Sequence, residues 1–127
     1  MRALLDTSVL IAADALAPGV EAAISTVSIA ELHFGLLVAT NDDARATRAA
    51  RLGLVEARFP DPLPLDDRVA REWGRLQAAV ASRGGESRRR MADLAIAATA
   101  NVHGAVLITH NIKDFTIVDD LIDVRTP

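Results

Sequence analysis

Three acidic residues occupy positions where a globular chain seldom places a charge. Asp6 follows the apolar segment 3–5, Glu31 lies in a segment with helical spacing, and Asp93 lies inside the apolar stretch 91–98. Burying a carboxylate costs free energy unless the group is paired, hydrogen-bonded or bound to a metal. Three such groups in one small chain suggest that they share a cation.

Two of these acids also have a structural interpretation. Asp6 could cap the helix predicted to begin at Thr7, although Thr7 and Ser8 could cap that helix equally well. Ser28 and Glu31 fit a capping box, in which a glutamate at the third helical position accepts a hydrogen bond from the backbone amide of the N-cap residue. Alone, Glu31 would be interpreted as a cap, and the other acids favour a place in the site.

Asp93 is the acid that is hardest to explain by structure alone. Aspartate disfavours helix interiors, and the neighbours of Asp93 are apolar. Arg89 or Arg90, one turn earlier, could pair with it. Arg88, Arg89 and Arg90 could also hold RNA phosphates, or they could form a solvated loop. Because cations are unfavourable at a helix N-terminus, the position of these arginines favours a functional role.

A fourth polar segment, 109–115, contains Asn111 and Asp114. Both side chains could cap a short helical turn or add oxygen ligands to the acidic site. Ligands that are all oxygen favour Mg²⁺ or Mn²⁺ over zinc. The three histidines lack the spacing of a metal site, and only His110, inside this segment, merits a test as a catalytic group.

Composition excludes several other functions. The chain has 127 residues, of which 50% are apolar, so one domain over 1–127 with its own core is expected. It contains no cysteine, which excludes disulfides, zinc thiolates and a cysteine nucleophile and fits a reducing, cytoplasmic location. No apolar run is long enough to span a membrane. Four aromatic residues are too few for a base-stacking platform, and the net charge of −3 gives no general attraction to nucleic acid.

The acids must be positioned by alternating strands and helices. The predicted strands are 2–6, 23–26, 105–109 and 121–124, with a further short one near 63. The predicted helices are 7–15, 28–39, 44–56, 67–82 and 91–102. This order predicts an α/β/α sandwich with a central, mainly parallel sheet of four to five short strands. Ligands bind beyond the carboxyl ends of such strands, which is where Asp6 and 109–111 fall.

Four motifs resemble those of PIN-domain nucleases, in order and in spacing over essentially the whole chain. They are Leu4–Leu10, the SxxELxxG pattern from Ser28 to Gly35, Asp93–Ala98, and Thr109–Asn111 with Asp114–Phe115. Each motif is short, but four in register are specific. The compact length resembles the VapC toxins of VapBC toxin–antitoxin pairs.

The resemblance implies a Mg²⁺- or Mn²⁺-dependent ribonuclease with Asp6, Glu31 and Asp93 as its core acids. Asp6 and Asp93 would be the direct metal ligands. Asn111 stands where many relatives carry aspartate, so Asn111 could supply a neutral oxygen and Asp114 the fourth charge. Glu31 or Asp114 could orient or deprotonate the attacking water.

The resemblance also implies a biological setting. Metal-activated water would hydrolyse tRNA or rRNA, leave 5′-phosphate and 3′-hydroxyl ends, and so inhibit translation. A VapB-type antitoxin would cover an apolar groove and the acidic site, and the chain would form a homodimer. The apolar run 36–38 in the predicted helical hairpin fits partner binding and core packing equally well.

Three other functions are considered. One is a PIN-fold binding module that has lost catalysis, and another is a PIN nuclease outside any toxin–antitoxin pair. An aspartyl phosphotransferase of the haloacid-dehalogenase type needs a second aspartate two residues after Asp6, but Ser8 occupies that position.

Overall fold

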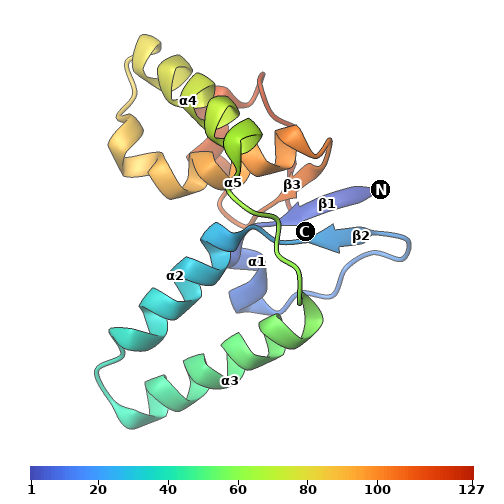
Figure 1. The fold of residues 1–127 in the computed structure, drawn as a ribbon, viewed down its shortest axis with the longest axis vertical. Helices are drawn as coiled ribbons and strands as arrows, with labels where there is room; N and C mark the ends of the chain where they lie inside the picture. Colours follow the sequence, from blue (N-terminus) through green and yellow to red (C-terminus); the bar gives the residue numbers. More distant parts are fainter.

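A four-stranded parallel sheet forms the centre of the computed structural model, which describes all 127 residues (Figure 1). The strands are β1 (Arg2–Leu5), β2 (Glu21–Ala23), β3 (Val106–Ile108) and β4 (Val124–Arg125). Their order across the sheet is β2-β1-β3-β4, so β1 and β3 are the inner pair. The carboxyl ends of β1 and β3 therefore lie side by side, and each is followed by one of the predicted polar segments.

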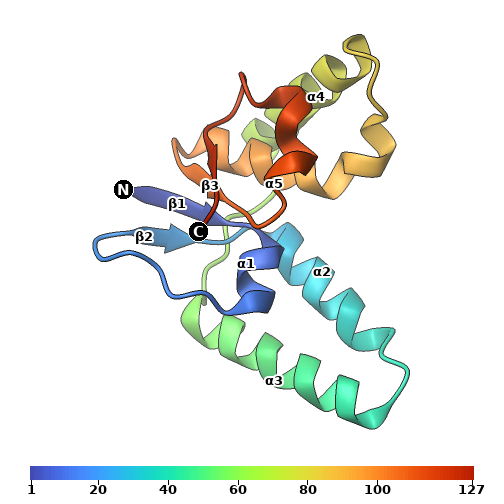
Figure 2. The same ribbon diagram turned by 180° about the vertical axis from the view of Figure 1, so that it is seen from behind.

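Helices cover both faces of this sheet, as Figures 1 and 2 show. They are α1 (Thr7–Ala12), α2 (Thr26–Leu37), α3 (Asp42–Arg58), α4 (Asp67–Ser82) and α5 (Met91–Val102), with 3-10 helices η1 (Ser87–Arg90) and η2 (Ile112–Val118). The α2–α3 hairpin projects on one side, and α4, α5 and η2 pack on the other. The predicted α/β/α sandwich is confirmed, with four strands that are all parallel.

Alternation along the inner strands divides the core into two halves. Leu4 and Leu107 pack with α4, α5 and η2, whereas Leu5 and Ile108 pack with α1, α2 and α3. Side chains on a strand point alternately to opposite faces, so two layers of helices can bury apolar surface on one sheet. The predicted apolar stripe of α4 is also confirmed, since Val69, Leu76 and Val80 are fully buried and Trp73 packs against them.

No helix has the length and apolar character needed to cross a membrane.

Several predicted boundaries are wrong. Helix α2 begins at Thr26 because the Ser25 side chain accepts a hydrogen bond from the Val27 amide at 3.0 Å. Strand β2 therefore ends at Ala23, where the predicted strand 23–26 begins, and the Leu63 strand is only a bridge to Ser25. Helix α1 ends early because Ala13 adopts a left-handed conformation, with φ of 56°.

Two segments near the site also differ from the prediction. The last strand is β4, which starts where the predicted strand 121–124 ends. The three arginines 88–90 lie in the 3-10 helix η1, which leads directly into α5, and not in a loop. This ordered entry fixes where the arginine side chains leave the backbone relative to Asp93.

Candidate active site

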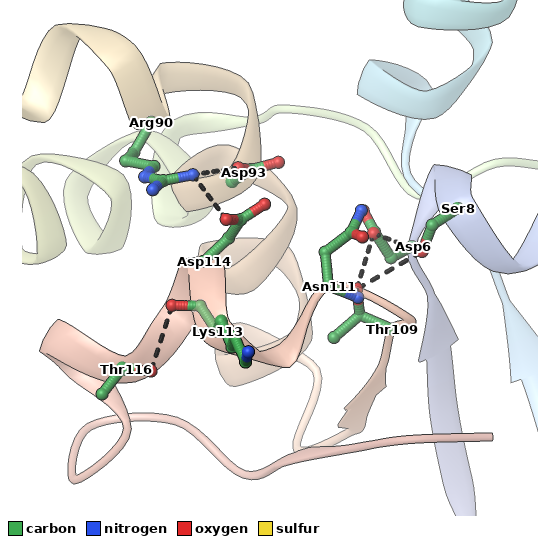
Figure 3. A network of polar contacts seen from close by, with 9 residues as sticks. All are labelled: Asp6, Ser8, Arg90, Asp93, Thr109, Asn111, Lys113, Asp114 and Thr116. Carbon is green, nitrogen blue, oxygen red and sulfur yellow. Dashed lines mark hydrogen bonds and ion pairs between the residues drawn. The ribbon is translucent and has the colours of Figure 1, made fainter.

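Asp6 is held by hydroxyl groups where β1 meets α1. Its Oδ2 atom accepts hydrogen bonds from Ser8 Oγ and Thr109 Oγ1, both at 2.8 Å (Figure 3). The residue is only 4% exposed, and although it occupies the N-cap position of α1, its side chain makes no capping hydrogen bond. The capping interpretation of Asp6 is therefore wrong. Neutral hydroxyl donors satisfy the buried carboxylate without cancelling its charge.

Thr109 connects this carboxylate to the polar segment after β3. The Asp6 amide donates to the Ile108 carbonyl at 2.9 Å, and the Asn111 amide donates to Thr109 Oγ1 at the same distance. The Asn111 side chain does not cap η2, and it points toward Asp6 in Figure 3. The sheet thus brings two segments together that lie more than 100 positions apart in the chain.

Glu31 reaches the same edge from the second turn of α2. Thr7 Oγ1 donates to Glu31 Oε1 at 2.7 Å and lies 2.9 Å from Ser28 Oγ. The predicted capping box of Ser28 and Glu31 is therefore wrong, because Ser25 is the cap and Ser28 is buried within the helix. Burial raises the pKa of Glu31, the Thr7 hydrogen bond lowers it, and the charge of Asp6 raises it further.

Asp93 lies in the first turn of α5, where 27% of its side chain is exposed. Its pKa is raised from 3.8 to about 6, chiefly by burial. The negative charges of Asp6, Asp114 and Glu31 raise it further, while Arg90 lowers it. Asp93 is therefore close enough to the other three acids for the four to form one region of negative charge.

Arg90 supplies the positive charge of this region. Its Nη1 atom lies 2.8 Å from Asp114 Oδ1 and 3.9 Å from Asp93 Oδ2 (Figure 3). The predicted pairing of Asp93 with an arginine one turn earlier is present, and Arg90 also reaches a second acid from η2. Arg89 has only a 3.8 Å contact with Glu86, and Arg88 forms no ion pair.

The four acids do not yet converge on one point. No three acidic or histidine side chains are arranged closely enough to hold a metal ion. Their donors nevertheless suit a hard divalent cation, because all are carboxylate oxygens and their charges raise the pKa of Asp93. A cation held between Asp93 and Asp114 would have to replace the Arg90 guanidinium.

The predicted residues outside this cluster have other partners. The His110 ring contacts the Asp14 carboxylate and none of the four acids, although the His110 amide donates to Ser8 Oγ at 3.1 Å. The hydroxyls of Thr7, Ser8 and Thr109 were not predicted to support the acids. Their signal in the sequence is adjacency, since two of them directly follow Asp6.

Comparison with known families matches residues 3–121 to the PIN domain. The chain therefore belongs to the PIN-domain family, as its motifs suggested. Two relatives indicate which group of PIN-domain proteins the chain resembles. Ribonuclease VapC5 of Mycobacterium tuberculosis is 39% identical over 128 residues, which cover 95% of this chain and 90% of that protein. Ribonuclease VapC4 of the same organism is 34% identical and covers 94% and 93%.

Solved structures agree with this assignment. The VapBC-5 toxin–antitoxin structure from Mycobacterium tuberculosis superposes with a TM-score of 0.81 at 36% identity, over 98% of this chain and 96% of that one. A toxin–antitoxin complex from Klebsiella pneumoniae gives a TM-score of 0.66 at 25% identity, covering 98% and 97%. Within the PIN-domain family, the chain is thus a member of the VapC group.

Proposed function

We propose that the chain is a divalent-metal-dependent endoribonuclease and the toxin of a VapBC-type pair. The observation that carries the proposal is that Asp6, Glu31 and Asp114, from three other segments of the chain, lie close enough to Asp93 for their charges to raise its pKa. Carboxylates without a cation would repel the phosphate that is to be hydrolysed, so hydrolysis at this site requires a cation. Relatives named as ribonucleases support the same reading.

Asp6 and Asp93 would hold the metal, Mg²⁺ or Mn²⁺. Glu31 and the side-chain oxygen of Asn111 would be further ligands. When bound, a divalent cation supplies charge neutralisation and Lewis-acid polarisation of a phosphate oxygen. The hydroxyl groups of Ser8 and Thr109 orient the Asp6 carboxylate. Support of this kind typically matters tenfold or more for metal affinity.

The reaction is hydrolysis of a phosphodiester. A water oxygen attacks phosphorus and the bond from phosphorus to the 3′ oxygen breaks. The 3′ oxygen takes a proton from solvent, so the products carry 5′-phosphate and 3′-hydroxyl ends. Glu31 or Asp114 orients the water and takes its proton. Burial raises the pKa of Glu31, which makes its carboxylate a stronger base than an exposed glutamate.

The arginines of η1 would contact the RNA. Arg88 and Arg89 are exposed, and Arg90 becomes free for phosphate once another cation neutralises Asp93 and Asp114. Guanidinium forks match phosphate oxygens well and position the backbone without reading its sequence. We propose tRNA or rRNA as the substrate, with inhibition of translation as the consequence and the cytoplasm as the location.

An antitoxin would bind the groove between α1 and α3. This groove has a volume of about 550 Å³, and its lining is apolar apart from a few side chains such as Arg51, Arg58 and Asp14. Leu54, 74% exposed, lies in the same lining. Such a surface suits an apolar segment that carries acidic residues, and the toxin–antitoxin structures with this fold support a VapB-type partner. We also propose that the chain forms a homodimer.

The test is incubation of purified, antitoxin-free protein with total tRNA and rRNA in Mg²⁺, in Mn²⁺ and in EDTA. We expect discrete fragments that require metal and that disappear in Asp93→Asn. Fragments that persist in EDTA would contradict the metal dependence. Intact RNA under every metal, with folded protein, would instead favour a binding module that has lost catalysis.

A further inference from the structure

A second, polar cleft opens directly beside the acidic site. It lies between η1 and η2 and has a volume of about 360 Å³, with Arg89, Arg90, Lys113 and Thr116 among its lining residues. We call it the η1–η2 cleft. Asp114 lines it as well, so a ligand in the cleft lies next to the carboxylates.

The charges of this cleft differ from those of the chain as a whole. Its charged residues are three cations, Arg89, Arg90 and Lys113, against two anions, Glu86 and Asp114, giving a local excess of one positive charge. The whole chain carries −3. A local positive charge next to a strongly acidic site is where an anionic ligand would be retained.

Lys113 is the cation available to such a ligand. It is the only lysine of the chain, it is exposed, and it forms no ion pair, whereas Arg90 is held by Asp93 and Asp114. In Figure 3 it lies between Asp114 and Thr116, on the same short helix. Arg89, with one exposed contact of 3.8 Å to Glu86, is only weakly engaged.

Gly85 keeps the two walls of the cleft close together. A Cβ atom at this position would lie 2.6 Å from Ile117 Cδ1 and 2.7 Å from Val80 Cγ1, which is too close for any larger residue without movement. The segment leading into η1 can therefore pack directly against η2. Arg89 from η1 and Lys113 from η2 both line the resulting cleft.

We propose that the η1–η2 cleft binds a backbone phosphate of the RNA next to the one that is hydrolysed, with Lys113 and Arg89 as its cations. This rests on the proposed ribonuclease function and adds a second contact point for the substrate. Arginine, lysine and threonine side chains are the usual partners of phosphate oxygens. Once the acids hold another cation, Arg90 is also released to contact this phosphate.

The experiment measures binding of fluorescently labelled total tRNA in EDTA, between about 50 and 200 mM salt. Each phosphate neutralised on a single strand contributes about 0.7 to the slope of log affinity against log salt. Lys113→Gln should therefore reduce the slope by about 0.7 and weaken binding about fivefold at about 0.1 M salt. Lys113→Arg should retain both.

Arg71→Gln is the matched control. It removes the same charge from an exposed residue near the start of α4, far along that helix from the cleft, where Arg71 pairs with Asp67. We expect wild-type binding from it. An equal loss in both variants would show only the effect of net charge and would overturn the proposal, as would an unchanged slope in Lys113→Gln.

This test does not depend on cleavage. Failure of the nuclease proposal appears as intact RNA in Mg²⁺, while failure of the phosphate proposal appears in the EDTA binding slopes. Absence of salt-dependent tRNA binding by the wild-type protein would also overturn the phosphate proposal. With Mg²⁺, Lys113→Gln should raise KM about fivefold and leave kcat within about twofold, because the cleft binds a phosphate that does not react.

Discussion

The two halves of the acidic site are held by different chemistry. Around Asp6, the neutral hydroxyls of Ser8 and Thr109 fix a buried carboxylate and leave its charge intact. Around Asp93 and Asp114, a single guanidinium balances two half-buried carboxylates. The Asp6 half therefore has a carboxylate free to bind a cation. The half with Asp93 and Asp114 already holds the Arg90 guanidinium. We infer that the Asp6 half fixes the position of a metal and that the Arg90 half adjusts when it binds.

The largest effect should come from removing the fixed charge. Asp6→Asn keeps the shape of the side chain but halves its acceptor oxygens and removes the charge, so ribonuclease activity at saturating Mg²⁺ should fall by about 10² or more. Cleavage rates measure this, and circular dichroism checks the fold. A variant that retains near-normal activity would exclude Asp6 as a metal ligand.

The pH dependence of stability should come from the adjustable half. The pKa of Asp93 is 3.8 unfolded and about 6 folded, so the folded metal-free chain holds this proton more tightly. Stability from this group is present at low pH and is lost as pH rises from about 4 to 6, by up to about 3 kcal/mol. Asp93→Asn should abolish this loss and stabilise the metal-free protein near neutral pH.

Urea unfolding in EDTA at about pH 4 and about pH 7 measures this difference. If the free energy of unfolding changes equally in wild type and Asp93→Asn between the two pH values, the surroundings of Asp93 do not raise its pKa. Metal binding needs charged carboxylates, so activity should fall in the opposite direction, as pH decreases through about 6.

The hydroxyl support can be tested with Thr109→Val. This change keeps the shape but removes the hydrogen bond to Asp6, so metal affinity and activity should fall by about tenfold or more. Thr99→Val is the matched control, because the buried Thr99 hydroxyl bonds only to the Ala95 carbonyl inside α5. Equal effects in the two variants would argue that loss of a buried hydroxyl, not support of the site, is responsible.

The smallest effect should come from the exchangeable cation. Arg90→Gln removes the group that competes with a metal for Asp93 and Asp114, so Mn²⁺ affinity measured by calorimetry should rise about fivefold, or about 1 kcal/mol. Arg89→Gln removes the same charge one residue earlier, without contact to either acid. Weaker Mn²⁺ binding by Arg90→Gln would contradict the exchange.

Local pattern was sufficient to predict the layers and to single out the candidate acids. Apolar strands and the stripe of α4 repeat with the period of their own backbone, so the sandwich could be predicted without long-range information. Asp6 and Asp93 were identifiable because each carboxylate interrupts an apolar run. Glu31 was ambiguous, since a helix start and a functional site favour the same residue type there.

Only the tertiary structure decided how these groups are held. Ser25 and Ser28 are equivalent as caps in the sequence, and the cap is Ser25, where the chain turns from the bridge with Leu63 into α2. The contacts of Thr109 with Asp6 and of Arg90 with Asp114 join residues far apart in the chain. The sequence by itself determined which side chains carry the charge, because burial patterns are local; folding alone decided which donors meet them, because those contacts require the closed sheet.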